Sequence, residues 1–145
     1  MNQSHKQVLE ALQVSWAAYV ERFRRLTPEE QECFLFRQGY ARFADLLAHV
    51  TAWWEDAIHT IRARLADPRL PLKEYDVDAF NAKAVERARE RSEAEVIQSF
   101  EAARRELLAL VQSLPEEAFE NDRIAKRLYV EAVGHLEEHE ILVNP

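Results

Sequence analysis

The sequence contains very little glycine and almost no cysteine. Gly39 and Gly134 are the only two glycines among 145 residues, whereas a β-rich fold of this size needs many turns, and most turn types draw on glycine. The single cysteine, Cys33, excludes an internal disulfide, so nothing suggests a small secreted scaffold. These shortages favour a few long helices in a reducing compartment, and we expect the protein in the cytoplasm.

Long apolar runs and an excess of positive charge are also missing. No apolar run approaches the roughly 18 residues that a membrane helix needs. The first residues, Met1 to Lys6, are polar and lack the apolar core of a signal peptide. The formal net charge is -7, opposite in sign to a surface that binds phosphates. We therefore expect neither a membrane nor a nucleic-acid partner.

Strong helix formers dominate the rest of the composition, since Ala, Leu, Glu and Arg are the commonest residues. Apolar residues recur at intervals of three and four, which is the period of an amphipathic helix. The pattern predicts an all-α, single-domain four-helix bundle over residues 1–145, with a longer connection around Pro68 and Pro71 between the second and third helices. The expected helices cover 4–26, 42–66, 76–113 and 124–142.

Helix-capping residues mark some of these boundaries. Ser4 is expected to cap the first helix. Thr27, Pro28 and Glu30 form a capping-box pattern, in which the threonine and glutamate side chains satisfy each other's backbone N–H groups. This pattern predicts a short helical turn after the first helix.

Three histidines lie where inward-facing leucines would be expected. His135 and His139 are four residues apart, so a helix projects both imidazoles from one face. His49 lies on the apolar side of the second helix, between Leu46 and Trp53. Three buried neutral imidazoles each carry a lone pair that needs a partner, and one divalent cation accepts all three. We therefore predict a metal site at His49, His135 and His139.

The same helical geometry suggests supporting residues. Asp45 precedes His49 by four residues and Glu131 precedes His135 by four, so either carboxylate is a candidate partner for a ring N–H or a fourth ligand. Ordinary surface carboxylates have the same pattern. The adjacent Trp53 and Trp54 cannot both face inward, so we expect Trp53 to form a wall of the site and Trp54 to pack laterally or in a subunit contact.

Two interpretations without metal chemistry stay open. The imidazoles could be core residues that hydrogen-bond to Glu131, Asp45 or Tyr129. Alternatively, a non-catalytic bundle could hold a small hydrophobic or electrophilic ligand between aromatic side chains such as Trp16, Phe43 and Trp53. In the metal reading, three ligands with an open position describe a catalytic site.

The histidine pattern resembles that of the DinB superfamily. Asp45-Leu-Leu-Ala-His49-Val-Thr-Ala-Trp53, followed by the late His135-x-x-x-His139, is similar to the motifs of this family, and nearest to the ClbS/DfsB-type proteins. The similarity extends through Asp76-Val-Asp78-Ala-Phe80-Asn81. Relatives often have Gly-Trp-Ser before the second helix, where this chain has Gly39-Tyr40-Ala41.

The resemblance implies an up-up-down-down bundle, commonly a homodimer, with a divalent metal such as nickel or zinc on His49, His135 and His139. It also implies two kinds of activity on small electrophiles. Several relatives are S-transferases that use low-molecular-weight thiols, and one branch hydrolyses an electrophilic toxin. The sequence itself contains no recognisable thiol-binding motif.

Overall fold

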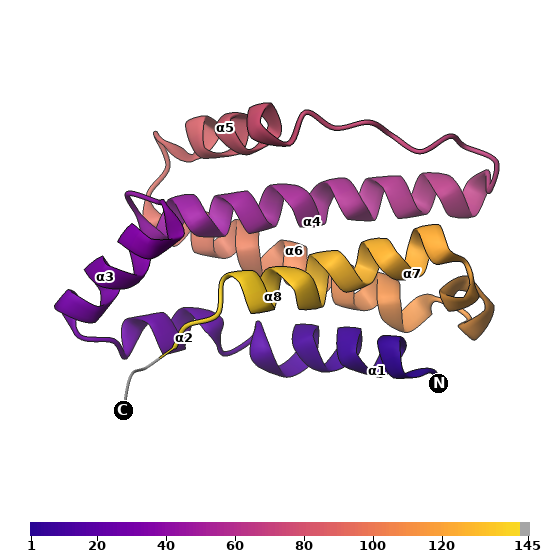
Figure 1. The fold of residues 1–145 in the computed structure, drawn as a ribbon, viewed down its shortest axis with the longest axis horizontal. Coiled ribbons are helices and arrows are strands. Elements are labelled where there is room, and N and C mark those ends of the chain that lie inside the picture. Colours follow the sequence, from indigo (N-terminus) through magenta and orange to yellow (C-terminus); the bar gives the residue numbers. More distant parts are fainter. Residues whose placement is uncertain (143–145) are drawn as a thin grey trace.

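The computed structural model describes residues 1–142, and all regular secondary structure in that part of the chain is helical. The predicted all-α class is therefore confirmed. Figure 1 shows most of the helices lying roughly parallel or antiparallel along one long axis. In chain order the elements are α1 (Gln3–Glu10), the π-helical η1 (Ala11–Ser15), α2 (Tyr19–Arg24), α3 (Pro28–Gln38), α4 (Phe43–Ala66), α5 (Val77–Ala88), α6 (Glu93–Ser113), the 3-10 helix η2 (Glu116–Glu120), α7 (Asp122–Tyr129), the π-helical η3 (Val130–Gly134) and α8 (His135–Glu138).

The beginning of the chain follows the predicted helix closely, although its cap differs. The Asn2 side chain, rather than Ser4, accepts the hydrogen bond from the His5 N–H at 2.8 Å. Thr27 and Glu30 form the capping box predicted from the sequence. The helix that they start, α3, continues to Gln38 and ends at Gly39, whose φ of 81° is a left-handed conformation that glycine adopts without steric cost.

The single helix expected over residues 76–113 is wrong, because the chain breaks into α5 and α6 between Ala88 and Glu93. Ser92 caps α6 by accepting the Glu95 N–H, and the Glu95 carboxylate accepts the Ser92 N–H in return. The break therefore has a sequence signal, a serine followed three residues later by glutamate. It lets α5 lie along the outer side of α4 while α6 packs along a different side (Figure 1).

The first and last helical segments of the chain run in the same direction. The Trp16 indole N–H donates to the Ala132 carbonyl at 2.7 Å, and the Tyr19 hydroxyl donates to the His139 carbonyl at 2.6 Å. One turn further along, Arg22 donates to the Ile141 carbonyl at 2.8 Å. Residue numbers rise together on the two sides, so α1 and α2 are parallel to α7 and α8.

Helix α4 runs in the opposite direction to the last helical segment and in the same direction as α6. Its Trp54 donates to the Glu131 carbonyl and its Asp56 pairs with Arg127. Residue numbers therefore rise along α4 as they fall along the last segment, so the two are antiparallel. On α6, Phe100 stacks on Trp54 and Glu106 pairs with Arg62, so here the numbers rise together. The order is therefore up-down-down-up, which corrects the expected up-up-down-down topology (Figure 1).

An aromatic cluster at the centre of the bundle joins three of these helices. Trp16 meets Trp54 edge to face with ring centroids 5.0 Å apart, and Phe100 lies 5.2 Å from Trp54 and 6.0 Å from Trp16. All three rings are fully buried. The expectation of a lateral or subunit contact for Trp54 is therefore wrong. Replacing any of these rings with alanine would cost about 3–5 kcal/mol of stability.

The connection between α4 and α5 is long and extended, as the prolines predicted. It follows the outer side of α4 in Figure 1. Arg64, a buried side chain of α4, holds the connection by donating to the Leu70 carbonyl at 2.8 Å and to the Pro71 carbonyl at 3.4 Å. Within residues 1–142, no helix combines the length and the apolar character needed to cross a bilayer.

Candidate metal centre

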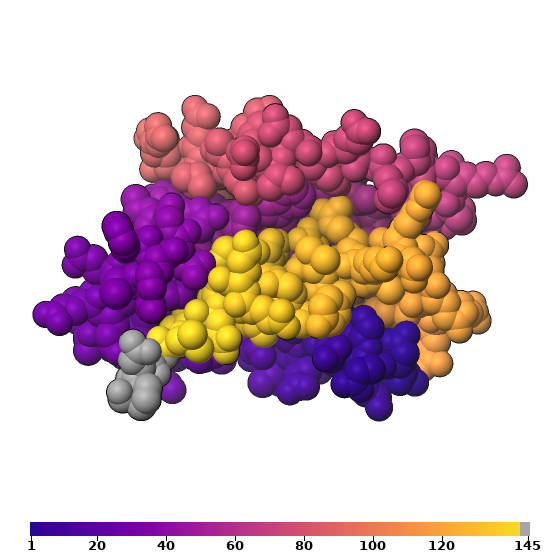
Figure 2. All heavy atoms as spheres, in the orientation of Figure 1, coloured from indigo at the N-terminus to yellow at the C-terminus, as the bar shows by residue number. Residues whose placement is uncertain are grey.

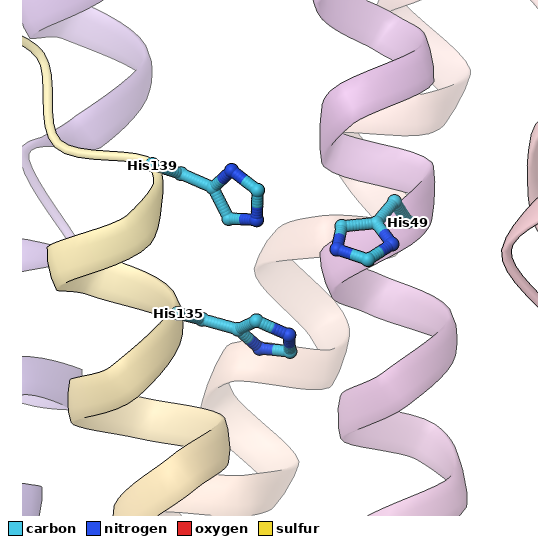
Figure 3. Close-up of side chains that lie close together, drawn as sticks. All are labelled: His49, His135 and His139. Atoms are coloured by element: carbon cyan, nitrogen blue, oxygen red, sulfur yellow. The ribbon is translucent and has the colours of Figure 1, made fainter. Parts of the chain in front are cut away.

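The structure brings His49, His135 and His139 together inside the bundle. Figure 3 shows the rings of His135 and His139 pointing from the end of the chain towards His49 on α4. One potential ligand nitrogen from each ring lies within 4.8 Å of the other two. All three side chains are buried, with exposed fractions of 6%, 7% and 4% respectively.

An asparagine from α5 orients His49. The Asn81 side-chain oxygen lies 2.9 Å from His49 Nδ1 and accepts a hydrogen bond from the Trp53 indole N–H at 2.7 Å. Because an indole N–H only donates, the atom facing both rings is the acceptor oxygen. His49 Nδ1 therefore carries the proton and donates a hydrogen bond to the Asn81 oxygen, which leaves Nε2 with a free lone pair.

A glutamine from α3 orients His139 in the same way. The Gln38 side-chain oxygen lies 2.7 Å from His139 Nδ1, while the Gln38 amide nitrogen donates to the Glu138 carbonyl at 3.3 Å. The second contact fixes the orientation of the amide, because a carbonyl only accepts. His139 Nδ1 is therefore the donor, and Nε2 is again the unprotonated nitrogen.

A π-helical turn orients His135. In an α-helix the His135 N–H would pair with the Glu131 carbonyl, but in η3 it donates to Val130, one residue earlier. The Glu131 carbonyl instead accepts from His135 Nδ1 at 3.1 Å and from the Trp54 indole at 2.9 Å. The local backbone geometry thus supplies the acceptor that selects the His135 tautomer.

The three rings are neutral in this environment. Burial, reinforced by the neighbouring His49 and His139, lowers the pKa of His135 to about 3. Burial and the nearby His49 lower the pKa of His139 to about 4. Burial also lowers the pKa of His49, against the opposing effect of its hydrogen bond to Asn81. Neutral imidazoles are the form that binds metals.

This donor set fits a divalent cation. Among the described residues, His139 Nε2 is a buried polar atom without any hydrogen-bond partner, a condition that carries a free-energy penalty. The Nδ1 atoms of His49 and His135 are hydrogen-bonded to oxygen acceptors, as that of His139 is. One ligand nitrogen from each of the three rings lies within 4.8 Å of the others. Three neutral imidazole nitrogens with oxygen acceptors behind them match the ligand shells that zinc, nickel, copper or iron use.

The residues expected to support the site have different roles. The Asp45 carboxylate pairs with Arg42 at 2.8 Å, and Asn81 is the partner of His49. The Glu131 carboxylate lies 3.4 Å from His135 Nδ1 but makes its shorter contact, 2.8 Å, with Arg127. Burial raises the pKa of Glu131 to about 7 despite Arg127. Trp53 contributes through its hydrogen bond to Asn81.

Sequence reasoning missed three residues beside the cluster. Asn81 and Gln38 are 32 and 101 residues from the histidines that they contact, so no local spacing could identify them. Tyr40, in the Gly39-Tyr40-Ala41 segment, lies with its ring centroid 5.8 Å from His49 and 6.5 Å from His139. His59, by contrast, is exposed and lies outside the cluster.

Comparison with known families finds a match over most of the chain. The model of the DinB superfamily, whose members commonly bind metals, matches residues 11–142. Comparison with curated proteins and with solved structures finds no significant match. The match spans nearly the whole chain and includes all three clustered histidines. The chain therefore belongs to the DinB superfamily.

Proposed function

We propose that His49, His135 and His139 hold one divalent metal ion, zinc or nickel, through their Nε2 atoms. The observation that carries the proposal is the shared arrangement of the three rings. Each Nδ1 is committed to an oxygen acceptor, so three lone pairs meet in a buried space. In the alternative of three satisfied core histidines, each Nε2 would have a donor, and His139 Nε2 has none among the described residues.

We further propose that the protein is a metal-dependent transferase or hydrolase that acts on small electrophiles, with a low-molecular-weight thiol as the co-substrate of the transferase. A bound metal would lower the pKa of a water or thiol in its open coordination position. The chain's own contribution is to keep the three ligands neutral and fixed and to leave room beside them for a substrate.

A cavity of about 610 Å³ supports this proposal; its lining includes two neighbours of the clustered histidines but none of the histidines themselves. Tyr40 and Asn81, which contact the cluster, line it together with Arg42 and Arg89. Burial, with smaller contributions from Glu138 and Asp45, raises the pKa of Tyr40 to about 12. The hydroxyl therefore stays protonated at neutral pH and can donate a hydrogen bond to a substrate oxygen.

Metal analysis of the purified protein tests the site. We expect about one divalent ion per chain in the unaltered protein and in His59→Ala, whose exposed histidine lies outside the cluster. We expect His135→Ala to lose the metal, because two imidazoles bind more weakly than three. Equal metal content in His135→Ala and His59→Ala, or none in any of the proteins, would refute the site.

An activity measurement separates the enzyme from a non-catalytic ligand-binding bundle. We expect the metal-loaded protein to accelerate the reaction of a small thiol, or of water, with a small electrophile at neutral pH, and chelation to abolish that acceleration. A non-catalytic bundle predicts a ligand that raises the melting temperature equally with and without metal. That result, without any turnover, would favour the binding role.

Two finer assignments follow from the resemblance alone, and a third, the location, follows from the composition of the sequence. We propose that the protein is of the ClbS/DfsB type, forms a homodimer and is located in the cytoplasm. Light scattering on the purified protein tests the dimer directly. A mass of one chain, 17.0 kDa, at micromolar concentration would contradict it.

A further inference from the structure

A second cavity, of about 400 Å³, lies on a different part of the molecule from the histidines. It is lined by residues of α4, of the connection that follows α4, of α7 and of the start of η3. Figure 2 shows α7 in orange beside this connection in magenta on one face of the molecule. None of the clustered histidines lines it; the lining residues are Thr60, Ile61, Arg64, Leu72, Lys73, Tyr75, Asp122, Arg123, Lys126, Arg127 and Val130.

Positive charge without a carboxylate partner gathers around this cavity. The guanidinium groups of Arg64 and Arg123 donate to the Leu70 carbonyl at 2.8 and 3.1 Å, and neither has an acidic partner among the described residues. Within residues 1–142, the exposed ammonium group of Lys126 has neither a hydrogen-bond nor an ion-pair partner. Asp122 is the one acidic side chain in the lining. This concentration of cations is unusual in a chain of net charge -7.

The remaining two cations of the lining are already neutralised. Asp56 pairs with Lys73 at 3.1 Å and with Arg127 at 2.9 Å, and Arg127 also pairs with Glu131. These contacts hold Lys73 and Arg127 in place. Arg64 is buried and already donates to the Leu70 and Pro71 carbonyls, so the cations available to a ligand are Arg123 and Lys126.

The walls between the charges are apolar. Ile61 lies at the base, and Leu72 and Val130 stand at the edge with 65% and 55% of their surfaces exposed. Exposed aliphatic side chains lose their contact with water when a ligand covers them, which favours binding. Inorganic phosphate would leave these walls uncovered, whereas a neutral hydrocarbon would leave the cations unpaired.

We infer that this cavity binds an organic anion with an aliphatic body, of the class of medium-chain carboxylates. The carboxylate would pair with Arg123 and Lys126 at the opening, where charge-assisted hydrogen bonds are short and strong. The hydrocarbon chain would lie against Ile61, Leu72 and Val130. This inference goes beyond the proposed function, since it concerns a separate site whose residues include no metal ligand.

Calorimetric titration of the full chain with octanoate tests the inference. The test variant is the double substitution Arg123→Glu and Lys126→Glu, and its matched control is Lys6→Glu with Arg24→Glu. The control changes the net charge equally at two exposed positions of α1 and α2. We expect one octanoate per chain, about tenfold weaker binding to the test variant, and unchanged binding to the control.

Three further titrations test which features of the ligand the cavity requires and where it binds. Octan-1-ol should bind at least about tenfold more weakly than octanoate, and equal binding would overturn the requirement for an anion. Inorganic phosphate should bind more weakly than octanoate, and equal binding would overturn the aliphatic requirement. Octanoate should bind equally well after chelation. Loss of binding on chelation would place the carboxylate at the histidines and refute the second site. A protein that is purified without any metal, cannot be loaded with one and still binds octanoate would refute only the proposed metal function.

Discussion

At the scale of single residues, the group behind each imidazole determines which nitrogen is available to a metal. Asn81, Gln38 and the Glu131 carbonyl each accept a hydrogen bond from one Nδ1. They come from three different helical segments, so the cluster depends on contacts that span the bundle. Such supporting hydrogen bonds commonly raise metal affinity and fix the ring orientation.

Replacing Asn81 should weaken metal binding without removing a ligand. In Asn81→Leu, the His49 ring and the Trp53 indole both lose their acceptor, so the His49 ring is no longer held in one orientation. We expect metal affinity to fall by about 10- to 100-fold. Competition with a chromophoric chelator measures the change. Asn81→Asp, which keeps an acceptor oxygen at this position, should retain most of the affinity; equal affinity in all three proteins would contradict the orienting role.

The histidines themselves were within reach of sequence reasoning, because helical spacing places His135 and His139 on one face and His49 on an inward stripe. Their partners were not. Asp45 has the helical spacing to reach His49, yet its carboxylate pairs with Arg42 instead. Spacing along one helix cannot reveal a side chain that another helix brings into contact.

At the scale of elements, the π-helical turn η3 connects the aromatic core to the metal centre. One carbonyl in this turn, that of Glu131, accepts from both Trp54 and His135. Trp54 stacks on Phe100 within the fully buried core. The position of His135 is therefore tied to the Trp54 indole of α4 through this shared carbonyl.

Removing the Trp54 donor should disturb the metal centre more than the fold. Trp54→Phe preserves an aromatic ring but leaves the Glu131 carbonyl with one donor fewer, and we expect a stability loss of about 1–3 kcal/mol. We also expect a shift in the visible absorption spectrum of the cobalt-substituted protein, which reports ligand geometry. Phe100→Leu is the matched control. It should lower stability without changing the spectrum, and equal spectra in both variants would contradict the link.

The break between α5 and α6 is a place where local sequence patterns led to a wrong prediction, a single helix over residues 76–113. Residues 86–95 are almost all strong helix formers, so propensity favours one continuous helix. The capping box of Ser92 and Glu95 prevails because it satisfies the free backbone N–H groups at a new helix start. The same type of signal was recognised at Thr27, where a proline also marked the boundary.

At the scale of the whole molecule, the buried histidines should make the metal-free protein sensitive to acid. The folded-state pKa values of His135 and His139, about 3 and about 4, lie below the ordinary 6.5. The unfolded chain therefore binds more protons between these values and 6.5, and folding stability falls as the pH drops below 6.5. One pH unit below 6.5, each ring would cost about 1.4 kcal/mol.

Urea unfolding of the chelated protein at pH 8 and pH 5.5 measures this effect. Glu131, with its raised pKa of about 7, acts in the opposite direction and offsets part of the loss. His135→Leu removes one of the buried imidazoles. The stability of this variant should therefore fall less between the two pH values than that of the unaltered chain. An equal fall in both proteins would contradict the buried neutral state of His135.

The direction of the helices lay beyond sequence reasoning for a different reason. Apolar stripes show which side of each helix is buried, but not which helix lies against it. The up-down-down-up order depends on contacts such as Trp16 with Ala132 and Arg62 with Glu106, between residues far apart in the chain. The all-α class follows from composition, whereas the arrangement depends on tertiary packing.

The parallel contact between the two ends of the chain has a consequence for biosynthesis. Tyr19 and Arg22 donate hydrogen bonds to the carbonyls of His139 and Ile141. The first helices therefore support the segment that carries two of the three histidines. His49 leaves the ribosome long before His135 and His139. At that stage the chain has only one imidazole of the cluster, the one on α4. A nascent chain therefore acquires its three-histidine centre only after residue 139 has emerged and docked against helices that were made first.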